Sequence, residues 1–198
     1  MRRADHNDLL PAAAFRRGVL ALDLSSATGW AFCRPGAVAA WPVTRPFTGL
    51  TIVPPDPRPL TEIGFGTWDL GRGLHGRRFD ALSQHLRAHA APGLVIIEQA
   101  IPGKFSRTNS ATEIAQGLRA VVCGWAANKN VVLREAPINS VKAWFGSPMQ
   151  RDKAPMIAMA KTLGFAVQTD HEADALAILD LSLARGAMAA RLMGRLAA

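Results

Sequence analysis

The order of patterns along this sequence predicts an α/β fold, with a mixed five-stranded sheet and helices on both of its faces. Residues 18–24 and 28–33 are apolar runs joined by the polar pair Ser25-Ser26, which is typical of two strands in a hairpin. Residues 94–97 are apolar and β-branched on both faces, which favours a central strand covered by helices on both sides. The helical patterns between and after these strands complete the prediction.

The rest of the N-terminal half is less regular. Residues 1–17 are predicted to be a flexible extension, residues 37–43 a third strand, and the proline-rich residues 44–66 an irregular insertion or loop. Residues 67–90 are predicted to form a helix, because apolar side chains recur there at roughly helical spacing. These side chains are Leu70, Leu74, Phe79, Leu82 and Leu86.

The C-terminal half alternates between helix and strand. Ser110 and Glu113 have the spacing of a capping box, which predicts a helix from there to about residue 128. Residues 131–134 are predicted to be a further strand. Two short helices over 139–145 and 153–163 precede a long helix over 171–185, and residues 187–198 are expected to be a tail.

The composition indicates a globular protein with an anionic partner. There are 23 Lys and Arg against 15 Asp and Glu, and the net charge of +8 favours a polyanionic partner, although a generally basic, soluble protein is the alternative. Nucleic acid is the better interpretation if the acids described below hold a metal. No apolar run approaches the ~20 residues of a membrane span, so no membrane partner is expected. The N-terminus lacks a secretory signal, and Cys33 and Cys123 lie far apart in apolar patterns, so we expect a cytoplasmic protein with reduced core cysteines.

Four side chains suited to metal binding stand at the ends of predicted elements. Asp23 and Glu98 lie near the ends of two strands, and His171 and Asp174 lie in the first turn of the last helix, where their i, i+3 spacing puts them on one face. An acid at the end of a buried strand is costly unless something pairs with it, so acids from distant parts of the chain suggest a shared cation. The sequence therefore predicts a metal-dependent active site.

Each of these signals also has a purely structural alternative. Glu98 can cap a neighbouring helix, and Asp170 or His171 can be the N-cap of the last helix, with Asp174 as a first-turn acid that the helix dipole favours. Gly29 and the small residues before it are expected to let a phosphate backbone approach Asp23 closely.

Taken together and in order, VLALDLSSATGW, GLVIIEQA and TDHEADALAIL resemble the RuvC family of Holliday junction resolvases, which has a ribonuclease H-like fold. The resemblance covers about residues 17–185 and includes QGLRAVVCGWAA and APINSVKAWFG followed by RDKAPM. It implies one nuclease domain over residues 18–186 and a bacterial or phage-encoded enzyme that cuts four-way or other branched DNA.

The resemblance also implies roles for individual residues. Asp23, Glu98 and Asp174 are the expected carboxylate ligands of two Mg²⁺ or Mn²⁺ ions, with Asp23 bridging both. His171 stands at a fourth position that is Asp in some family members and His in others, where it would ligate an ion or orient the attacking water. Lys142 and Lys153 match lysines that approach DNA phosphates.

The family acts as a homodimer, so a homodimer is expected here. The helix predicted to end near residue 128 has an apolar surface that includes Leu118 and Val122, which can pack inside its own subunit or against a second copy.

The loop after Glu98 departs from the family. Family members carry an aromatic residue three positions after this Glu, where the present chain has Ile101. Phe105 can take that role from a shifted position, with Lys104 and Arg107 as phosphate contacts, and a solvated polar loop is the alternative. Junction selectivity therefore stays open: another nuclease acting on flaps, R-loops or packaging intermediates, or a non-catalytic DNA-binding module, are the competing functions.

Overall fold

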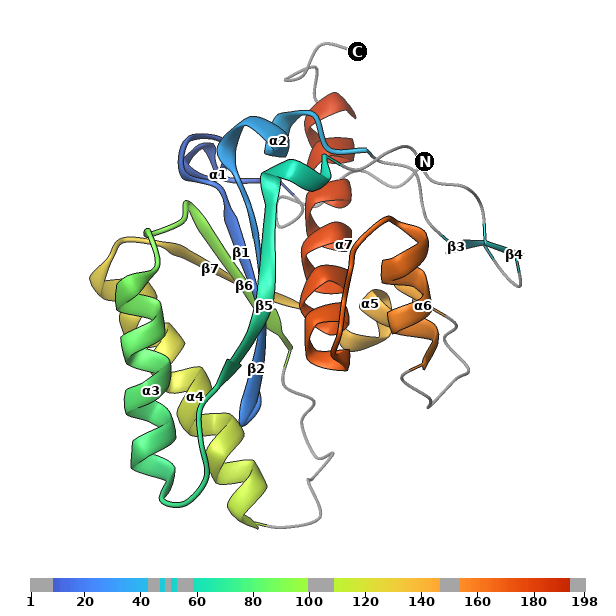
Figure 1. Ribbon diagram of the computed structural model, residues 1–198. Helices are drawn as coiled ribbons and strands as arrows, with labels where there is room; N and C mark the ends of the chain where they lie inside the picture. Colours follow the sequence, from blue (N-terminus) through green and yellow to red (C-terminus); the bar gives the residue numbers. More distant parts are fainter. Residues whose placement is uncertain are drawn as a thin grey trace.

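The computed structural model describes residues 9–42, 47–48, 51–52, 59–99, 109–146 and 154–192. Five strands form one sheet in the order β5-β2-β1-β6-β7. Helices α3 and α4 cover one face of this sheet, and the long helix α7 crosses the other face (Figure 1). The sheet strands are β1 (Val19–Asp23), β2 (Ala27–Cys33), β5 (Ile63–Asp69), β6 (Leu94–Glu98) and β7 (Val132–Ala136). The main helices are α3 (His75–Ala88), α4 (Asn109–Asn128), α5 (Ile138–Phe145), α6 (Ala154–Thr162) and α7 (Asp170–Leu192).

The sheet is mixed, as predicted. β1 pairs with β2, and β2 with β5, in the antiparallel sense, whereas β1, β6 and β7 run parallel to one another. In β1 and β6 every residue before the final acid is buried, which is the expected pattern for central strands covered on both faces. The predicted α/β class and the two-sided helical cover are therefore confirmed.

Two apolar clusters, one on each face, hold the layers together. Alternate residues of a strand point to opposite faces, so neighbours in β1 and β6 enter different clusters. On the side of α3 and α4 the cluster contains Leu20, Leu22, Leu82, Leu86, Val95, Ile97, Leu118 and Val122. On the side of α7 it contains Val19, Ala21, Leu94, Ile96, Ala173, Leu176, Ala177 and Leu183.

The predicted third strand at residues 37–43 is wrong. Residues Pro35–Ala39 form the short helix α2, which has Pro35 in its first turn and buries Ala37 and Val38. The strand that completes the sheet is β5, whose residues were predicted partly as insertion (44–66) and partly as helix (67–90). The other described residues of the predicted insertion are the small hairpin strands β3 (Phe47–Thr48) and β4 (Thr51–Ile52) and the 3-10 turn η2 (Leu60–Glu62).

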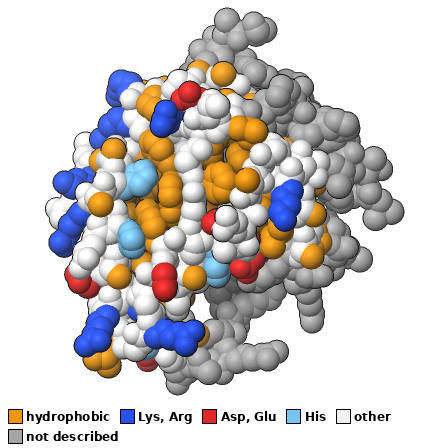
Figure 2. All heavy atoms as spheres, in the orientation of Figure 1, with side chains coloured by type: hydrophobic (Ala, Val, Ile, Leu, Met, Phe, Trp, Pro, Cys, Tyr) orange, Lys and Arg blue, Asp and Glu red, His pale blue; other side chains and the backbone are white. Residues whose placement is uncertain are grey.

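Glycine explains why β5 was missed. Gly64 and Gly66 interrupt its alternating pattern, and glycine is unfavourable in a strand unless something lies over it. Here the Trp30 ring covers them, because a Cβ built on Gly66 would stand 3.1 Å from Trp30 Nε1. Trp30 is partly buried and stacks on Trp68, with the two ring centroids 5.8 Å apart. Hydrophobic side chains gather on this side of the molecule in Figure 2.

Both ends of the described chain are more ordered than predicted. Residues 1–17 were expected to be flexible, but Ala12–Arg17 form helix α1, and Ala14 is fully buried. A side chain at Gly93 would overlap the backbone of Ala13, which shows how closely α1 lies on the start of β6. Likewise, α7 continues to Leu192 into the expected tail and buries Ala187.

Two further predictions concern cysteines and membranes. Cys33 is buried and Cys123 is exposed on α4, so the prediction of two core cysteines is right for Cys33 and wrong for Cys123. Burial raises the pKa of the Cys33 thiol to about 12, with a smaller contribution from Glu62. Within the described ranges, no helix combines the length and the apolar character needed to cross a membrane.

Candidate active site

Asp23 and Glu98 lie at the same edge and on the same face of the sheet. β1 and β6 are parallel neighbours, so their carboxyl ends meet at one edge, and each strand ends in its acid. Asp23 follows Val19 and Ala21 in the two-residue alternation, and Glu98 follows Leu94 and Ile96, which places both acids on the α7 face. Parallel pairing of fully buried strands thus brings the two carboxylates together.

The start of α7 is fixed by a capping box that the sequence contains as T-D-H-E. Thr169 Oγ1 accepts a hydrogen bond from the Glu172 amide (3.1 Å), and Glu172 Oε2 accepts one from the Thr169 amide (3.3 Å). Thr169 Oγ1 also lies 2.9 Å from Thr67 Oγ1 on β5, which links the helix start to the sheet edge. The N-cap is therefore Thr169, so His171 belongs to the first helical turn, whereas Asp174, which was predicted in that turn, begins the second.

Gly29 lets this first turn lie directly on β2. A Cβ at Gly29 would overlap the carbonyl group of His171, so any larger residue would displace the helix. Gly29 also pairs with Asp23 across the β1–β2 hairpin. The expectation that Gly29 admits a phosphate backbone is thus corrected, because a protein helix takes up that space.

This close approach produces a direct contact between Asp23 and His171, which are 148 residues apart in the chain. Nδ1 of His171 donates a hydrogen bond to Oδ2 of Asp23 over 2.8 Å, and the Ser25 hydroxyl lies 3.5 Å from the same nitrogen. The His171 side chain is 25% exposed and that of Asp23 14%, so the pair is sheltered but reachable from solvent.

The negative charges of the other acids affect the ionisation of Glu98. Its pKa is raised to about 7, first by burial and then by the negative charges of Asp23 and Asp174, whereas the positive charge of Lys142 lowers it. Lys142 lies on α5, and Asp174 on α7. The structure therefore brings three carboxylates and one lysine from β1, β6, α5 and α7 within electrostatic reach of one another.

The donor chemistry of this site fits a hard divalent cation. Three carboxylates with mutual repulsion are the oxygen ligands that Mg²⁺ and Mn²⁺ take, and a cation between them would remove the repulsion that raises the Glu98 pKa. Within the described residues, the side chains do not form a group of three or more His, Cys, Asp or Glu that could hold a metal ion. Asp23 instead pairs with His171, so the fit is in charge and chemistry rather than in a formed coordination shell.

Two residues near the site were not predicted from the sequence. Arg119 on α4 donates a hydrogen bond to the backbone carbonyl of Glu98 (3.1 Å) and forms an ion pair with Glu135. Asp180, only 1% exposed, accepts hydrogen bonds from Trp41 Nε1 (3.1 Å) and Trp144 Nε1 (2.7 Å). Asp180 thereby holds α5, which carries Lys142, against α7. The available signal for Asp180 was an aspartate within the otherwise apolar run of residues 175–181.

The remaining predicted contact residues have different outcomes. Lys104, Phe105, Arg107 and Lys153 lie outside the described residues. Leu118 and Val122 are fully buried in the core of their own subunit, so they cannot form the proposed contact with a second copy.

No protein-family profile and no curated protein matches the sequence. Solved structures do match. A structure of Thermus thermophilus RuvC in complex with a Holliday junction substrate has a TM-score of 0.56 and 16% identity, over 89% of this chain and 96% of that chain. A second T. thermophilus RuvC structure has a TM-score of 0.56, 17% identity and the same coverage. The yeast mitochondrial Holliday junction resolvase Ydc2 has a TM-score of 0.57 and 12% identity, over 94% of this chain and 84% of that chain.

These similarities define the class of fold. The chain has the ribonuclease H-like fold of RuvC-type resolvases, as the sequence motifs predicted. At 12–17% identity the likeness concerns the fold, so activity and substrate are argued from the chain's own residues.

Proposed function

We propose that this protein is a metal-dependent endodeoxyribonuclease that cuts four-way or otherwise branched DNA. The observation that carries the proposal is the electrostatic coupling of Glu98 to Asp23 and Asp174, since repelling carboxylates at one sheet edge suit a cation-binding site. The net charge of +8 favours a polyanionic substrate. The fold adds weight, because its solved relatives include a RuvC bound to a Holliday junction substrate.

In this proposal Asp23, Glu98 and Asp174 hold two Mg²⁺ or Mn²⁺ ions. Bound divalent ions supply water activation and neutralisation of the charge that develops on the phosphate. Asp23 ends the central strand β1 and is our choice for the carboxylate that both ions would share. His171, through its hydrogen bond to Oδ2, fixes the orientation of the Asp23 carboxylate, while its Nε2 lies 3.9 Å from Asp170 Oδ1.

Lys142 has a separate role in the proposal. Its charge acts on Glu98 from α5, so it stands beside the carboxylates without competing for a cation. A lysine there attracts a DNA phosphate toward the site and opposes its repulsion by the acids. The buried Asp180–Trp144 hydrogen bond keeps α5, and hence Lys142, in place.

The test compares labelled four-way, flap and linear duplex DNA, each incubated with purified protein with and without Mg²⁺. We expect Mg²⁺-dependent cuts in the four-way substrate, placed symmetrically in strands of like polarity. Preferential cutting of flaps would assign the protein to another class of branched-DNA nuclease. Binding of all substrates without cleavage in Mg²⁺ or Mn²⁺ would instead identify a non-catalytic DNA-binding module.

A further inference from the structure

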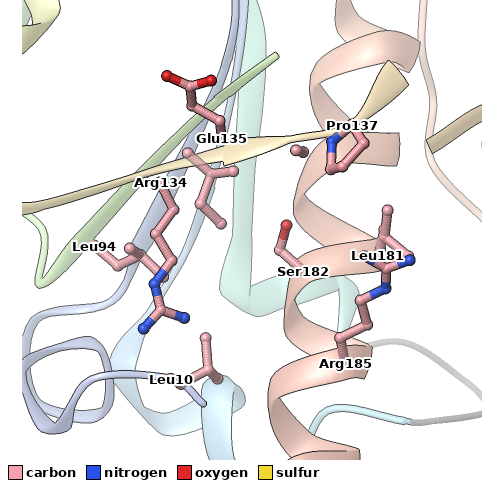
Figure 3. Close-up of a pocket in the computed structure, with 10 residues that line it drawn as sticks. Leu10, Leu94, Arg134, Glu135, Pro137, Leu181, Ser182 and Arg185 are labelled. Carbon is pink, nitrogen blue, oxygen red and sulfur yellow. The ribbon is translucent and has the colours of Figure 1, made fainter. Parts of the chain in front are cut away.

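A cavity lined by both apolar and charged side chains lies between the edge strand β7 and helix α7 (Figure 3). Its apolar floor contains Leu10, Leu94 and Ile96, and its polar rim contains Arg134 from β7 and Ser182 and Arg185 from α7. The cavity measures about 60 Å³. A single water needs only ~10–15 Å³ of such space, so a larger polar group fits here.

The charged rim of this cavity is positive. Arg134 and Arg185 are both partly buried, which weakens the screening of their charges by solvent. Glu135 is the one acid among the lining residues, but its carboxylate is ion-paired with Arg119 from α4 and points away from Arg134 in Figure 3. Arg134 also has a polar or charged partner within the protein, and a bound anion would join or replace that partner.

We propose that this cavity binds a phosphate group. A guanidinium group is planar and offers paired N–H donors that match two phosphate oxygens, so arginines on two sides of a cavity suit a tetrahedral anion. Arg134 lines the cavity from β7, and Arg185 lines it from α7. The Ser182 hydroxyl supplies a neutral donor between them. The apolar floor excludes water beneath the anion and strengthens these bonds.

The position of the cavity indicates where such a phosphate comes from. Leu94, Ile96 and Glu98 lie on one face of β6, so the floor begins two residues before Glu98, about 7 Å away at ~3.3 Å per residue. Ala136 also lines the cavity and pairs with Glu98 in the sheet. The inference about the source rests on the proposed function: the phosphate belongs to the DNA strand beside the cleavage position. Inorganic phosphate or a small phosphorylated molecule has the same chemistry.

The DNA experiment measures binding of a four-way substrate across a salt series, in Ca²⁺, with Arg134→Gln, Arg185→Gln and the double variant. Each change should flatten the dependence of log K on log salt by up to about one unit, because one fewer phosphate is neutralised. The control is Arg16→Gln, which removes the same charge from the exposed face of α1 nearby and does not line the cavity. If all three single changes flatten the salt dependence equally, the effect is explained by the loss of net charge alone. That result would contradict a phosphate site in the cavity.

A second experiment uses inorganic phosphate and pyrophosphate as probes, with binding measured by calorimetry at constant ionic strength. Ser182→Glu should abolish binding by placing a carboxylate between the arginines, whereas the size-matched Ser182→Gln should retain it. Either arginine variant should weaken binding at least about tenfold. Melting temperatures and circular dichroism of all variants confirm folding, and the Ser182 pair keeps the test informative if an arginine variant does not fold.

The two experiments together separate the possible results. Loss of probe binding with flattened salt slopes supports a DNA phosphate in the cavity. Loss of probe binding with unchanged slopes supports the site and assigns it to a small phosphorylated molecule. Probe binding that survives in both arginine variants and in Ser182→Glu overturns the proposal. Neither readout requires cleavage, so a protein that fails as a nuclease still gives a result for the cavity.

Discussion

Glu98 holds a carboxyl group in surroundings that disfavour its charge. Because its pKa is raised to about 7 from 4.5, the folded protein binds a proton at Glu98 more tightly than the unfolded chain does. The stability that this proton provides is fully present below about pH 4.5 and is lost as the pH rises through about 7. Burial is the main cause, and Asp23 and Asp174 add to it.

This shift predicts a pH-dependent difference between the protein and its Glu98→Gln variant. In EDTA, the variant should gain thermal stability relative to the parent as the pH rises from about 5 to about 8, because glutamine stays neutral throughout. Mg²⁺ should narrow the gap at the higher pH by stabilising the ionised carboxylate. Melting curves at several pH values check this, and a gap that is independent of pH would contradict the assigned shift.

Asp23→Asn should abolish cleavage and leave DNA binding largely intact. Asparagine keeps an oxygen that can accept the His171 hydrogen bond, so the fold is retained while the negative charge is lost. We expect a rate loss of about 100-fold or more, comparable to removal of one essential electrostatic group elsewhere. The matched control is Asp69→Asn, an exposed acid on β5. Near-normal cleavage by Asp23→Asn would show that the catalytic centre lies elsewhere.

The contact between α7 and β2 depends on the absence of a single side chain. Gly29→Ala should push the first turn of α7 away from the sheet and destabilise the protein by about 1–3 kcal/mol, as overpacking of a tight core contact does. The His171–Asp23 hydrogen bond should lengthen, so cleavage should fall more than binding. Denaturant unfolding and cleavage rates measure both effects.

Gly76→Ala is the control for this change, because nothing lies within 4 Å of a Cβ added there. That variant should match or slightly exceed the parent in stability, since alanine is the better helix former. Equal effects of the two substitutions would show that α7 does not rest on Gly29.

Elements with a regular apolar pattern were predicted well, whereas an element whose pattern is interrupted by glycine was not. β1 and β6 carry unbroken apolar runs, and α7 repeats apolar residues at helical spacing. In β5, by contrast, aromatic residues alternate with Gly64 and Gly66, which Trp30 covers through a tertiary contact. Asp23 and Glu98 were predicted as site residues because acids stand out at the ends of buried strands, and His171 and Asp174 because their spacing puts them on one face of the last helix. The pairing of Asp23 with His171 was not predictable, since it depends on how closely α7 approaches β2.

The whole molecule is expected to act as a homodimer. Leu118 and Val122 lie in the core, so a second copy would have to meet other residues of α4, such as the exposed Ala115 and Ala120. We predict sedimentation near twice 21.2 kDa at micromolar concentration. Ala120→Arg should return the protein to a monomer with an unchanged melting temperature, whereas Val122→Arg should unfold it. Monomeric wild-type protein that still makes paired cuts would contradict the dimer.

The hydrogen bond between Asp23 and His171 also affects when the site can form during protein synthesis. Its two partners are separated by 148 residues, and α7 is the last element of the described chain. A nascent chain emerges N-terminal end first, so the β1–β2 hairpin and its acid leave the ribosome long before the helix that completes the site. Pairing of β1 with β6 can bring Asp23 and Glu98 together earlier, but Asp174 and His171 join them only when α7 docks on Gly29. The proposed nuclease centre is thus completed only after α7 has been synthesised and has docked on the sheet.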